Sequence, residues 1–247
     1  MKGKTIIVTG ASSGLGKAIA TLFIEKGSNV VMNASNEVNL HAAFEEMGKP
    51  PNVVLAPGNI SKQEVSDKLV KAALDGFGTI DVLVNNAGIF QPKPFLEVEE
   101  KDLDAFLSVN LKGTFFTSQA VIRQMLKRGG GAIINIGTVL VDHAIAGFPA
   151  TAPIASKGAI HALTRQLAAE FGKNNIKVNT ISPGIIRSPL QSKIGVTDAD
   201  SLAGLHLLNR IGEPEEIAEA AYYLASSDFI TGETINVAGG HTVGHAI

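Results

Sequence analysis

The chain has 247 residues, of which 45% are hydrophobic and 18% are charged. This composition supplies apolar surface for a large core and excludes an intrinsically disordered protein. The 21 Lys and Arg residues against 23 Asp and Glu residues leave a net charge of −2. Such a balance gives no broad attraction for a phosphate backbone or an anionic membrane, so we expect neither nucleic acid nor membrane as a partner.

Cysteine is absent from the sequence, which excludes disulfide scaffolds, thiolate catalysis and zinc sites with cysteine ligands. We expect no metal site. The N-terminal apolar run ends at Gly10, so it is too short for a signal-peptide core or for a membrane span of about 20 residues. We therefore expect a cytoplasmic protein. Two further counts are unusual, namely 26 glycines and only two tyrosines.

Short β-branched runs alternate with helical patterns along almost the whole chain, which is typical of βαβ units in a parallel sheet covered on both faces. No linker or repeat interrupts this alternation, so we predict one α/β domain over residues 1–247 with a doubly wound parallel sheet. The expected strands are residues 5–9, 29–33, 52–56, 81–85, 132–136, 176–181 and 234–237. The expected helices cover residues 17–26 and 157–171, and two more begin at a capping box, Ser61 to Glu64, and at Gly212 to Glu216.

A glycine-rich loop, residues 10–16, follows the first expected strand directly and precedes a helix. Glycines there permit a tight turn and a close backbone approach, and the N-terminal N–H groups of the helix suit an anionic pyrophosphate. A nucleotide-triphosphate P-loop is excluded because Lys17 is followed by Ala18 rather than Ser or Thr. The loop predicts a dinucleotide site, and a glycine-rich turn without a ligand is the alternative.

The spacing of Gly10, Gly14 and Gly16 resembles that of the short-chain dehydrogenase/reductase family, whose fold is Rossmann-like with about seven strands and helices on both faces. This resemblance covers essentially the whole chain. The further motifs that carry it are Asn59-Ile60, Asn85 to Gly88, Asn110 within residues 109–113, Lys157 within residues 155–157, Pro183-Gly184, Gly232 and Gly239-Gly240.

The resemblance implies a nicotinamide dinucleotide bound along the carboxyl ends of the strands. Taken alone, Asn85 to Gly88 and Pro183-Gly184 also suit ordinary turns. The expected cofactor contacts are Gly10, Ser12, Ser13, Gly14, Leu15 and Gly16 at the pyrophosphate, Ser35 and Asn36 at the adenosine ribose, Asn59 and Ile60 at the adenine, Asn86, Ala87 and Gly88 at the ribose, Lys157 at the nicotinamide ribose, and Pro183, Gly184, Ile186 and Ser188 at the nicotinamide.

The end of the second expected strand bears on the choice between NAD and NADP. A carboxylate there accepts hydrogen bonds from the ribose 2′-hydroxyl of NAD, whereas NADP requires cations or neutral donors for its phosphate. The chain has Asn33 to Asn36 at this point, and its first acid is Glu37. The missing carboxylate favours NADP. Ser13 stands where NADP-preferring relatives often have a basic residue, so NAD remains the alternative.

In the family, a tyrosine hydroxyl exchanges the proton that accompanies hydride transfer, and a lysine one turn later lowers the pKa of that hydroxyl. A serine holds the substrate oxygen, and an asparagine anchors a water molecule. By this resemblance Asn110, Thr138 and Lys157 are the catalytic residues, with Thr138 at the serine position. Pro153 stands one turn before Lys157. The tyrosine is therefore absent.

Proline suits the first turn of a helix but transfers no proton, and loss of a general acid removes about 10²- to 10⁴-fold of rate. The two tyrosines, Tyr222 and Tyr223, lie far downstream and are assigned to packing. The replacement donors we consider are Lys157 acting through a water molecule, His143 or Asp142 on the loop after Thr138, and Thr151, whose hydroxyl is a poor acid.

The sequence thus predicts an NAD(P)-dependent oxidoreductase of the short-chain type that acts on a small carbonyl or alcohol substrate with a non-standard proton donor. The alternative is a catalytically silent NAD(P)-binding sensor or scaffold. Relatives assemble as tetramers through the helices that contain Asn110 and Lys157, so we expect a homo-oligomer, most simply a tetramer. Residues 191–208, which close over the substrate in relatives, contain no motif that identifies it.

Overall fold

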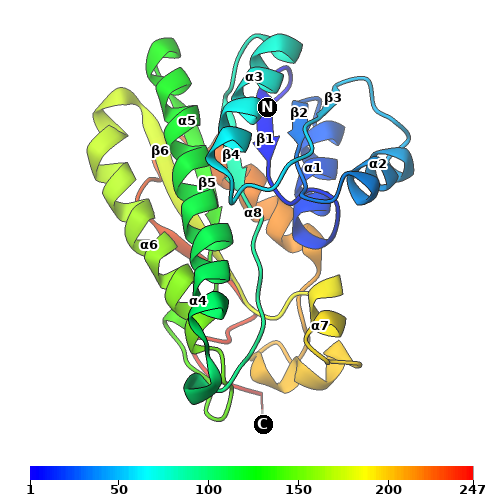
Figure 1. Ribbon diagram of the computed structural model, residues 1–247, viewed down its shortest axis with the longest axis vertical. Helices are drawn as coiled ribbons and strands as arrows, with labels where there is room; N and C mark the ends of the chain where they lie inside the picture. Colours follow the sequence, from blue (N-terminus) through cyan, green and yellow to red (C-terminus); the bar gives the residue numbers. More distant parts are fainter. Residues whose placement is uncertain (247) are drawn as a thin grey trace.

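The computed structural model describes residues 1–246 and contains a seven-stranded sheet in the order β3-β2-β1-β4-β5-β6-β7. Every neighbouring pair is parallel. The predicted α/β, doubly wound, Rossmann-like fold is confirmed (Figure 1). The strands are β1 (Thr5–Val8), β2 (Asn29–Met32), β3 (Val53–Leu55), β4 (Val82–Asn85), β5 (Gly131–Ile136), β6 (Ile176–Pro183) and β7 (Thr234–Val237).

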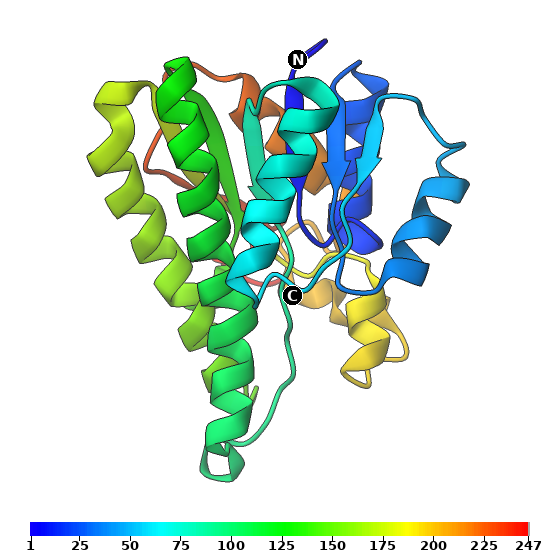
Figure 2. The same cartoon turned by 45° about the horizontal axis from the view of Figure 1, so that its top comes forward.

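Helices cover both faces of this sheet (Figures 1 and 2). One core contains residues of α1, α2 and α8, and a second core contains residues of α3, α5 and α6. The helices are α1 (Gly14–Glu25), α2 (Glu37–Glu46), α3 (Gln63–Phe77), α4 (Glu100–Phe106), α5 (Gly113–Arg128), α6 (Thr151–Phe171), α7 (Pro189–Lys193) and α8 (Pro214–Ser226). Shorter turns are η1 (Phe95–Glu97), the π-helical η2 (Leu107–Lys112), η3 (Val139–Val141), η4 (Gly172–Asn174) and η5 (Ala199–Leu205).

The central strands show why the sequence reads as continuous apolar runs rather than as an alternation. In β1, Ile6 and Val8 pack into the first core while Ile7 packs into the second, and all three are fully buried. Successive side chains of a strand point to opposite faces, and both faces of this sheet are covered, so most strand residues are apolar.

Two helix starts were predicted from local sequence patterns, and the capping box expected at one of them is wrong. α8 begins at Pro214, within the expected residues 212–216, and Glu213 and Glu216 form a reciprocal capping box there. By contrast, α3 begins at Gln63 after Lys62, and no side chain caps it. The Ser61 N–H donates instead to Asn59 Oδ1 at 3.0 Å. That local turn uses the polar groups that the predicted capping box needed and moves the helix start along the chain.

The starts of two helices and the end of one strand also differ from the predictions. α1 begins at Gly14 rather than at residue 17, and α6 begins at Thr151, six residues before Lys157. β6 extends to Pro183 because its last residues pair with β7. Pro153 lies in the first turn of α6, where the missing N–H has no intrahelical partner to lose.

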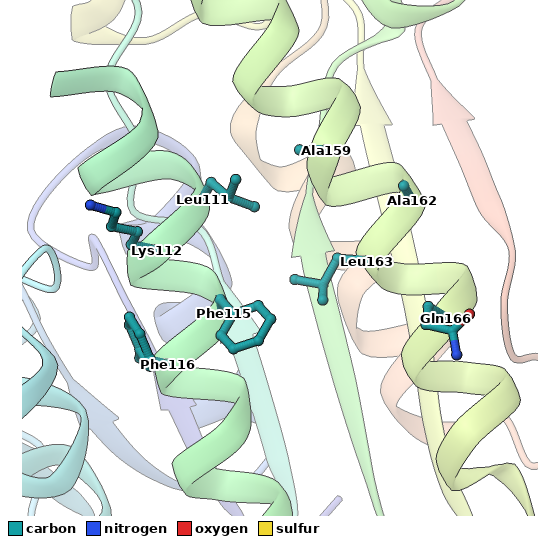
Figure 3. A pocket seen from close by; sticks show the side chains of 8 residues that line it. All are labelled: Leu111, Lys112, Phe115, Phe116, Ala159, Ala162, Leu163 and Gln166. Carbon is teal, nitrogen blue, oxygen red and sulfur yellow. The ribbon is translucent and has the colours of Figure 1, made fainter. Parts of the chain in front are cut away.

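The outer side of α5 and α6 carries an apolar hollow of about 470 Å³. Leu111 and Phe115 project toward Leu163 across it (Figure 3). Phe115 is 43% exposed and meets Phe116 edge to face, with ring centroids 5.5 Å apart. Within residues 1–246, no helix is long and apolar enough to cross a membrane.

Candidate functional site

The strand order reverses between β1 and β4, and hydrogen bonds lock the two strand ends together there. Thr9 Oγ1 accepts from the N–H groups of Asn86 and Ala87, each at 3.0 Å. In return, Asn86 Nδ2 donates to the carbonyls of Thr9 and Gly10 at 3.0 and 3.1 Å. Ligands of doubly wound sheets bind at such a reversal. The lock holds the glycine loop beside the turn that follows β4.

The glycine loop is shaped to bring backbone close to a ligand. Gly10 and Gly14 have positive φ angles of 68° and 51°, which residues with side chains rarely adopt. A Cβ on Gly16 would lie 2.2 Å from the Gly10 carbonyl oxygen. α1 begins at Gly14, and the side chain of Ser13, its N-cap residue, makes no capping bond. The first N–H groups of the helix therefore remain available for an anion.

The end of β2 presents neutral polar groups and no carboxylate, as the sequence indicates. Asn33 is buried and its Nδ2 donates to the Ala56 carbonyl at 2.8 Å, which ties β2 to the end of β3. Asn36 caps α2 by accepting from the Asn39 N–H at 2.9 Å. Ser35 is exposed. Of the predicted cofactor contacts at this end, Ser35 has a free hydroxyl and Asn36 is partly committed to its own helix.

The predicted adenine neighbours divide into an exposed and a buried residue. Asn59 is exposed, whereas Ile60 is buried. A Cβ on Gly113, the first residue of α5, would lie 2.5 Å from Ile60 Cδ1. Ile60 therefore packs against the start of α5, and its side chain forms part of the wall rather than a polar contact.

Three of the predicted site residues converge from different elements. Lys157 Nζ, on α6, donates to the Ile136 carbonyl at the end of β5 at 2.6 Å. A Cβ on Gly88 would lie 3.1 Å from Asn110 Oδ1 and 3.3 Å from Lys157 Nζ. The turn after β4, the π-helical turn η2 and the first half of α6 therefore meet at one point.

Asn110 connects these elements through the hydrogen bonds of its side chain. It is fully buried in η2, and its Oδ1 accepts from the Ile89 N–H at 2.8 Å. Its Nδ2 donates to the Ile89 carbonyl at 3.0 Å and to Ser156 Oγ at 2.9 Å. Ser156 Oγ in turn donates to the Pro153 carbonyl at 2.7 Å. The wide turn of a π-helix, a feature frequent at functional sites, presents Asn110 inward.

Burial changes the acid strength of Lys157. It lowers the pKa of the Lys157 ammonium from its usual 10.5 to about 8, because the charged form loses solvation. A lysine with such a pKa holds a proton at neutral pH and releases it more readily than an exposed one. Acid–base catalysis is most effective when the pKa lies near the working pH.

Thr138 lies two residues beyond the carbonyl that holds Lys157. Its backbone is extended, and its Oγ1 accepts from the Leu140 N–H at 3.3 Å. The hydroxyl hydrogen therefore stays free to donate to a substrate oxygen. Asp142 and Thr151, two of the predicted alternative proton donors, are exposed.

The predicted nicotinamide neighbours follow β6. The Gly184 N–H donates to the Val237 carbonyl at 3.0 Å, and Ile186 pairs with Gly212 in an isolated bridge. Ser188 caps α7, and its hydroxyl donates to Gln191 Oε1 at 2.9 Å. This hydroxyl is therefore used by local hydrogen bonds within α7.

One further contact joins the two halves of the predicted cofactor site. A Cβ on Gly14 would lie 3.3 Å from Ser188 Cβ. The glycine loop and the segment after β6 therefore touch.

Comparisons with known proteins agree with this geometry. A family model described as Enoyl-(Acyl carrier protein) reductase matches residues 10–242. The chain is 35% identical to the 3-oxoacyl-[acyl-carrier-protein] reductase FabG of Thermotoga maritima over 97% of its own length and 98% of the relative. The chain belongs to the short-chain dehydrogenase/reductase family.

Two further relatives are similarly close. The chain is 34% identical to the (2S)-[(R)-hydroxy(phenyl)methyl]succinyl-CoA dehydrogenase subunit BbsD of Thauera aromatica, with 98% of each chain covered. A short-chain type dehydrogenase/reductase from Mycobacterium marinum, whose crystal structure is known, superposes with a TM-score of 0.93 at 29% identity. The superposition covers 98% of this chain and 96% of the other.

Members of the short-chain dehydrogenase/reductase family use NAD or NADP, and the described residues fit such a cofactor. The glycine loop leaves helix N–H groups without side-chain partners, and the first turn of α1 contains no acidic residue. A side chain at Gly10 would meet Ala87 Cα at 2.8 Å, so glycine is required there for the loop to approach the turn after β4. Lys157, Asn110 and Gly88 meet at the other side of the strand reversal.

The two tyrosines lie on the face of the sheet opposite to Lys157. Both are on α8, which packs with α1 into the first core, whereas α6 packs into the second. The Tyr222 ring packs against Phe23, with centroids 5.5 Å apart, and Tyr223 is exposed. Their prediction as packing residues agrees with these contacts.

One buried titratable residue near the site was missed. His161 lies one turn after Lys157 on α6, and its Nε2 is 3.2 Å from Ser182 Oγ. A Cβ on Gly137 would lie 2.4 Å from the same nitrogen, so a glycine is required before Thr138. Burial lowers the pKa of His161. The spacing of four from Lys157 was the available signal, because it places both residues on one helix face.

We predict that Gly16→Ala abolishes tight cofactor binding, lowering the affinity for NADPH by at least about tenfold, one tenfold step being about 1.4 kcal/mol. The added methyl would overlap the Gly10 carbonyl and Asn86 Nδ2, so the loop has to move. Fluorescence titration with NADPH and NADH measures the effect. Gly172→Ala is the control, because nothing lies within 4 Å of its Cβ position. Equal affinities of Gly16→Ala and wild type would contradict the prediction.

Proposed function

We propose that this protein is an NADP-dependent oxidoreductase that reduces a small carbonyl substrate, with Lys157 as its proton donor in place of the family tyrosine. The observation that carries the proposal is the position of Lys157, half-buried beside Gly88 and Asn110, with Pro153 one helical turn before it. The catalytic roles of Asn110, Thr138 and Lys157 are part of this proposal.

Pro153 as the occupant of the tyrosine position is supported by the register of α6. It stands four residues before Lys157, on the same helix face, and its carbonyl accepts from Ser156 Oγ. Asn110 reaches this carbonyl through Ser156. These hydrogen bonds use the backbone of residue 153, and the proline side chain itself carries no hydroxyl.

A bound reduced dinucleotide would supply a hydride to the carbonyl carbon, while the carbonyl oxygen takes up one proton. Thr138 Oγ1 would donate a hydrogen bond to that oxygen and hold it near Ile136, where Lys157 Nζ is anchored. The Lys157 ammonium would then deliver the proton, through a water molecule in the space of the absent phenol. In alcohol oxidation the neutral amine would accept the proton instead.

Lys157 is favoured over the other candidate donors by burial. Asp142 and Thr151 are both exposed to solvent. The His143 ring packs against two other histidines at the edge of the sheet. Lys157 alone among these candidates combines a lowered pKa with contact to Gly88 and the Asn110 region.

The preference for NADP rests on the end of β2. Asn33, Ala34, Ser35 and Asn36 provide no carboxylate that would repel a 2′-phosphate. The amide nitrogen of Asn33 already donates hydrogen bonds to the chain just after β3. Ser35 is exposed and supplies a neutral hydroxyl donor for the phosphate.

The substrates to test first are 3-oxoacyl thioesters. Two of the relatives named above are a 3-oxoacyl-[acyl-carrier-protein] reductase and a (2S)-[(R)-hydroxy(phenyl)methyl]succinyl-CoA dehydrogenase subunit, and both names describe a carbonyl or hydroxyl group on a thioester-linked chain. A 3-oxoacyl-CoA thioester with NADPH therefore forms the starting assay.

The test of the function is a pair of substitutions at one position. We predict that Pro153→Tyr raises kcat for carbonyl reduction by about 10²-fold or more, because it supplies a positioned acid. Pro153→Ala should give no comparable gain, and it controls for a change in the helix start. Steady-state assays with NADPH measure both. A wild type and a Pro153→Tyr variant that bind NADPH without turning over any carbonyl would indicate a silent NADP-binding sensor or scaffold.

A pH profile tests the role of Lys157. The ammonium form is the donor, and its pKa is about 8. We predict that kcat for reduction is level below pH 8 and falls about tenfold per pH unit above it, whereas kcat for alcohol oxidation rises up to pH 8. NADPH affinity measured across the same range separates binding from proton transfer. A reduction rate that is flat to pH 10 or rises with pH would contradict Lys157 as the acid.

We also propose that the apolar hollow between α5 and α6 is an interface between copies of this chain. Phe115 is exposed in the single chain, and Leu111 and Leu163 line the same hollow (Figure 3). The hollow lies on helices adjoining Asn110 and Lys157. An interface there would therefore brace both residues from outside.

We predict that Phe115→Glu reduces the assembly from a tetramer to a species of at most half its mass, because a buried unpaired carboxylate is costly. Light scattering after gel filtration measures the mass against 25.8 kDa per chain. Val38→Glu on α2, another exposed apolar position, should leave the mass unchanged. A monomeric wild type, or a Phe115→Glu variant of wild-type mass, would refute the interface.

A further inference from the structure

Four histidines that are far apart in the sequence lie together at the carboxyl edge of the sheet. They are His143 after η3, His206 after η5, and His241 and His245 in the tail after β7. We call these four residues the histidine cluster. His241 and His245 are only four residues apart, a spacing that metal ligands often have, whereas only the fold brings His143 and His206 to them.

Three of the rings form a nearly equilateral triangle. The centroids of His143 and His241 are 5.4 Å apart, those of His143 and His245 are 5.4 Å apart, and those of His241 and His245 are 5.9 Å apart. Imidazoles that share one tetrahedral zinc ion, with Zn–N distances of about 2.1 Å, have centroids about 5 Å apart. The triangle therefore has the dimensions of a three-histidine metal site.

The nitrogens of these rings are also available. His241 is fully buried, yet neither of its ring nitrogens has a hydrogen-bond partner among the described residues. An unsatisfied buried polar group of this kind is costly and requires an explanation. A bound metal ion would give one of these nitrogens a partner.

The surroundings of His245 fit a ligand as well. Its Nδ1 lies 3.1 Å from the Leu205 carbonyl, which leaves Nε2 with a free lone pair when Nδ1 carries the proton. Metal-bound histidines commonly donate their second ring N–H to a backbone carbonyl, which orients the ring. His206 differs, because its Nε2 accepts from the Ile185 N–H at 3.1 Å. It packs against His241 as a neighbour rather than as a ligand.

As the rings stand, no group of three or more histidine or acidic side chains among the described residues is arranged to hold a metal ion. A half-turn of an imidazole about its Cβ–Cγ bond exchanges nitrogen and carbon positions and leaves the centroid almost in place. The proposed site requires such a rotation of side chains within the cluster.

From this geometry we infer a transition-metal site, most simply for Zn²⁺, with His143, His241 and His245 as ligands and a fourth position open to water. Imidazole ligands suit zinc, copper and nickel. The site would join the loop after Thr138 to the C-terminal tail. His206 would link it to the cofactor region, since its Nε2 lies 2.9 Å from the Cβ position of Gly184.

The test uses the full chain without an affinity tag, after treatment with a chelator. Titration calorimetry with ZnCl₂ should show one ion per chain, Co²⁺ should give the visible absorption of a tetrahedral complex, and Zn²⁺ should raise Tm. His241→Asn and His143→Gln should each weaken binding by at least about 100-fold, the upper end for loss of a mere supporting residue. Circular dichroism checks that the variants fold. If His241→Asn does not fold, the affinity of His143→Gln, a variant on a surface loop, decides the test.

Two variants serve as matched controls. His41→Gln alters an exposed histidine on α2 and should leave the affinity unchanged. His206→Gln should weaken binding less than tenfold, because His206 is not a ligand. No stoichiometric binding of Zn²⁺ or Co²⁺, a wild-type affinity in a folded His143→Gln variant, or an equal loss in His41→Gln would each overturn the inference.

Discussion

The site depends on the hydrogen-bonded lock between Thr9 and Asn86 at the point where the strand order reverses. One hydroxyl accepts two backbone N–H groups, and one amide donates to two carbonyls. These bonds satisfy backbone groups at the ends of β1 and β4 that would otherwise be buried without partners. They also fix the glycine loop next to Gly88. The predicted pyrophosphate site and the predicted site of hydride transfer are therefore held in one arrangement.

A second chain of hydrogen bonds holds the elements around Lys157 in place. Asn110 connects the turn after β4 to Ser156, and Ser156 connects to the Pro153 carbonyl. This scaffold depends on the backbone at residue 153 and not on its side chain, so it persists with proline there. Lys157 remains half-buried and retains its bond to the Ile136 carbonyl. These hydrogen bonds fit our proposal that Pro153 occupies the position of the family tyrosine and that Lys157 transfers the proton in its place.

Much of the fold was predictable because its signals are local. A buried parallel sheet requires apolar runs such as residues 5–8, and a dinucleotide loop requires glycines at fixed positions, so both are readable from one sequence. The capping box at Ser61 failed because an equally local competitor, the Asn59 side chain, takes the Ser61 N–H first.

The parts of the site that escaped prediction depend on long-range contacts. The role of Ser156 follows from its bonds to Asn110 and Pro153, which no spacing rule relates. The histidine cluster assembles from the loop after η3, the segment after η5 and the C-terminal tail. Burial, which sets the pKa values of Lys157 and His241, is also a property of the folded chain alone.

The central claim is that this chain transfers hydride although its family tyrosine is replaced. The most direct measurement is mass spectrometry of the product formed from a 3-oxoacyl-CoA thioester and NADPH dideuterated at the nicotinamide C4. The account predicts one deuterium in the 3-hydroxyacyl product with the wild-type protein, and loss of this label with Lys157→Met under saturating NADPH. Tight NADPH binding without any deuterium transfer, or undiminished transfer by Lys157→Met, would contradict it.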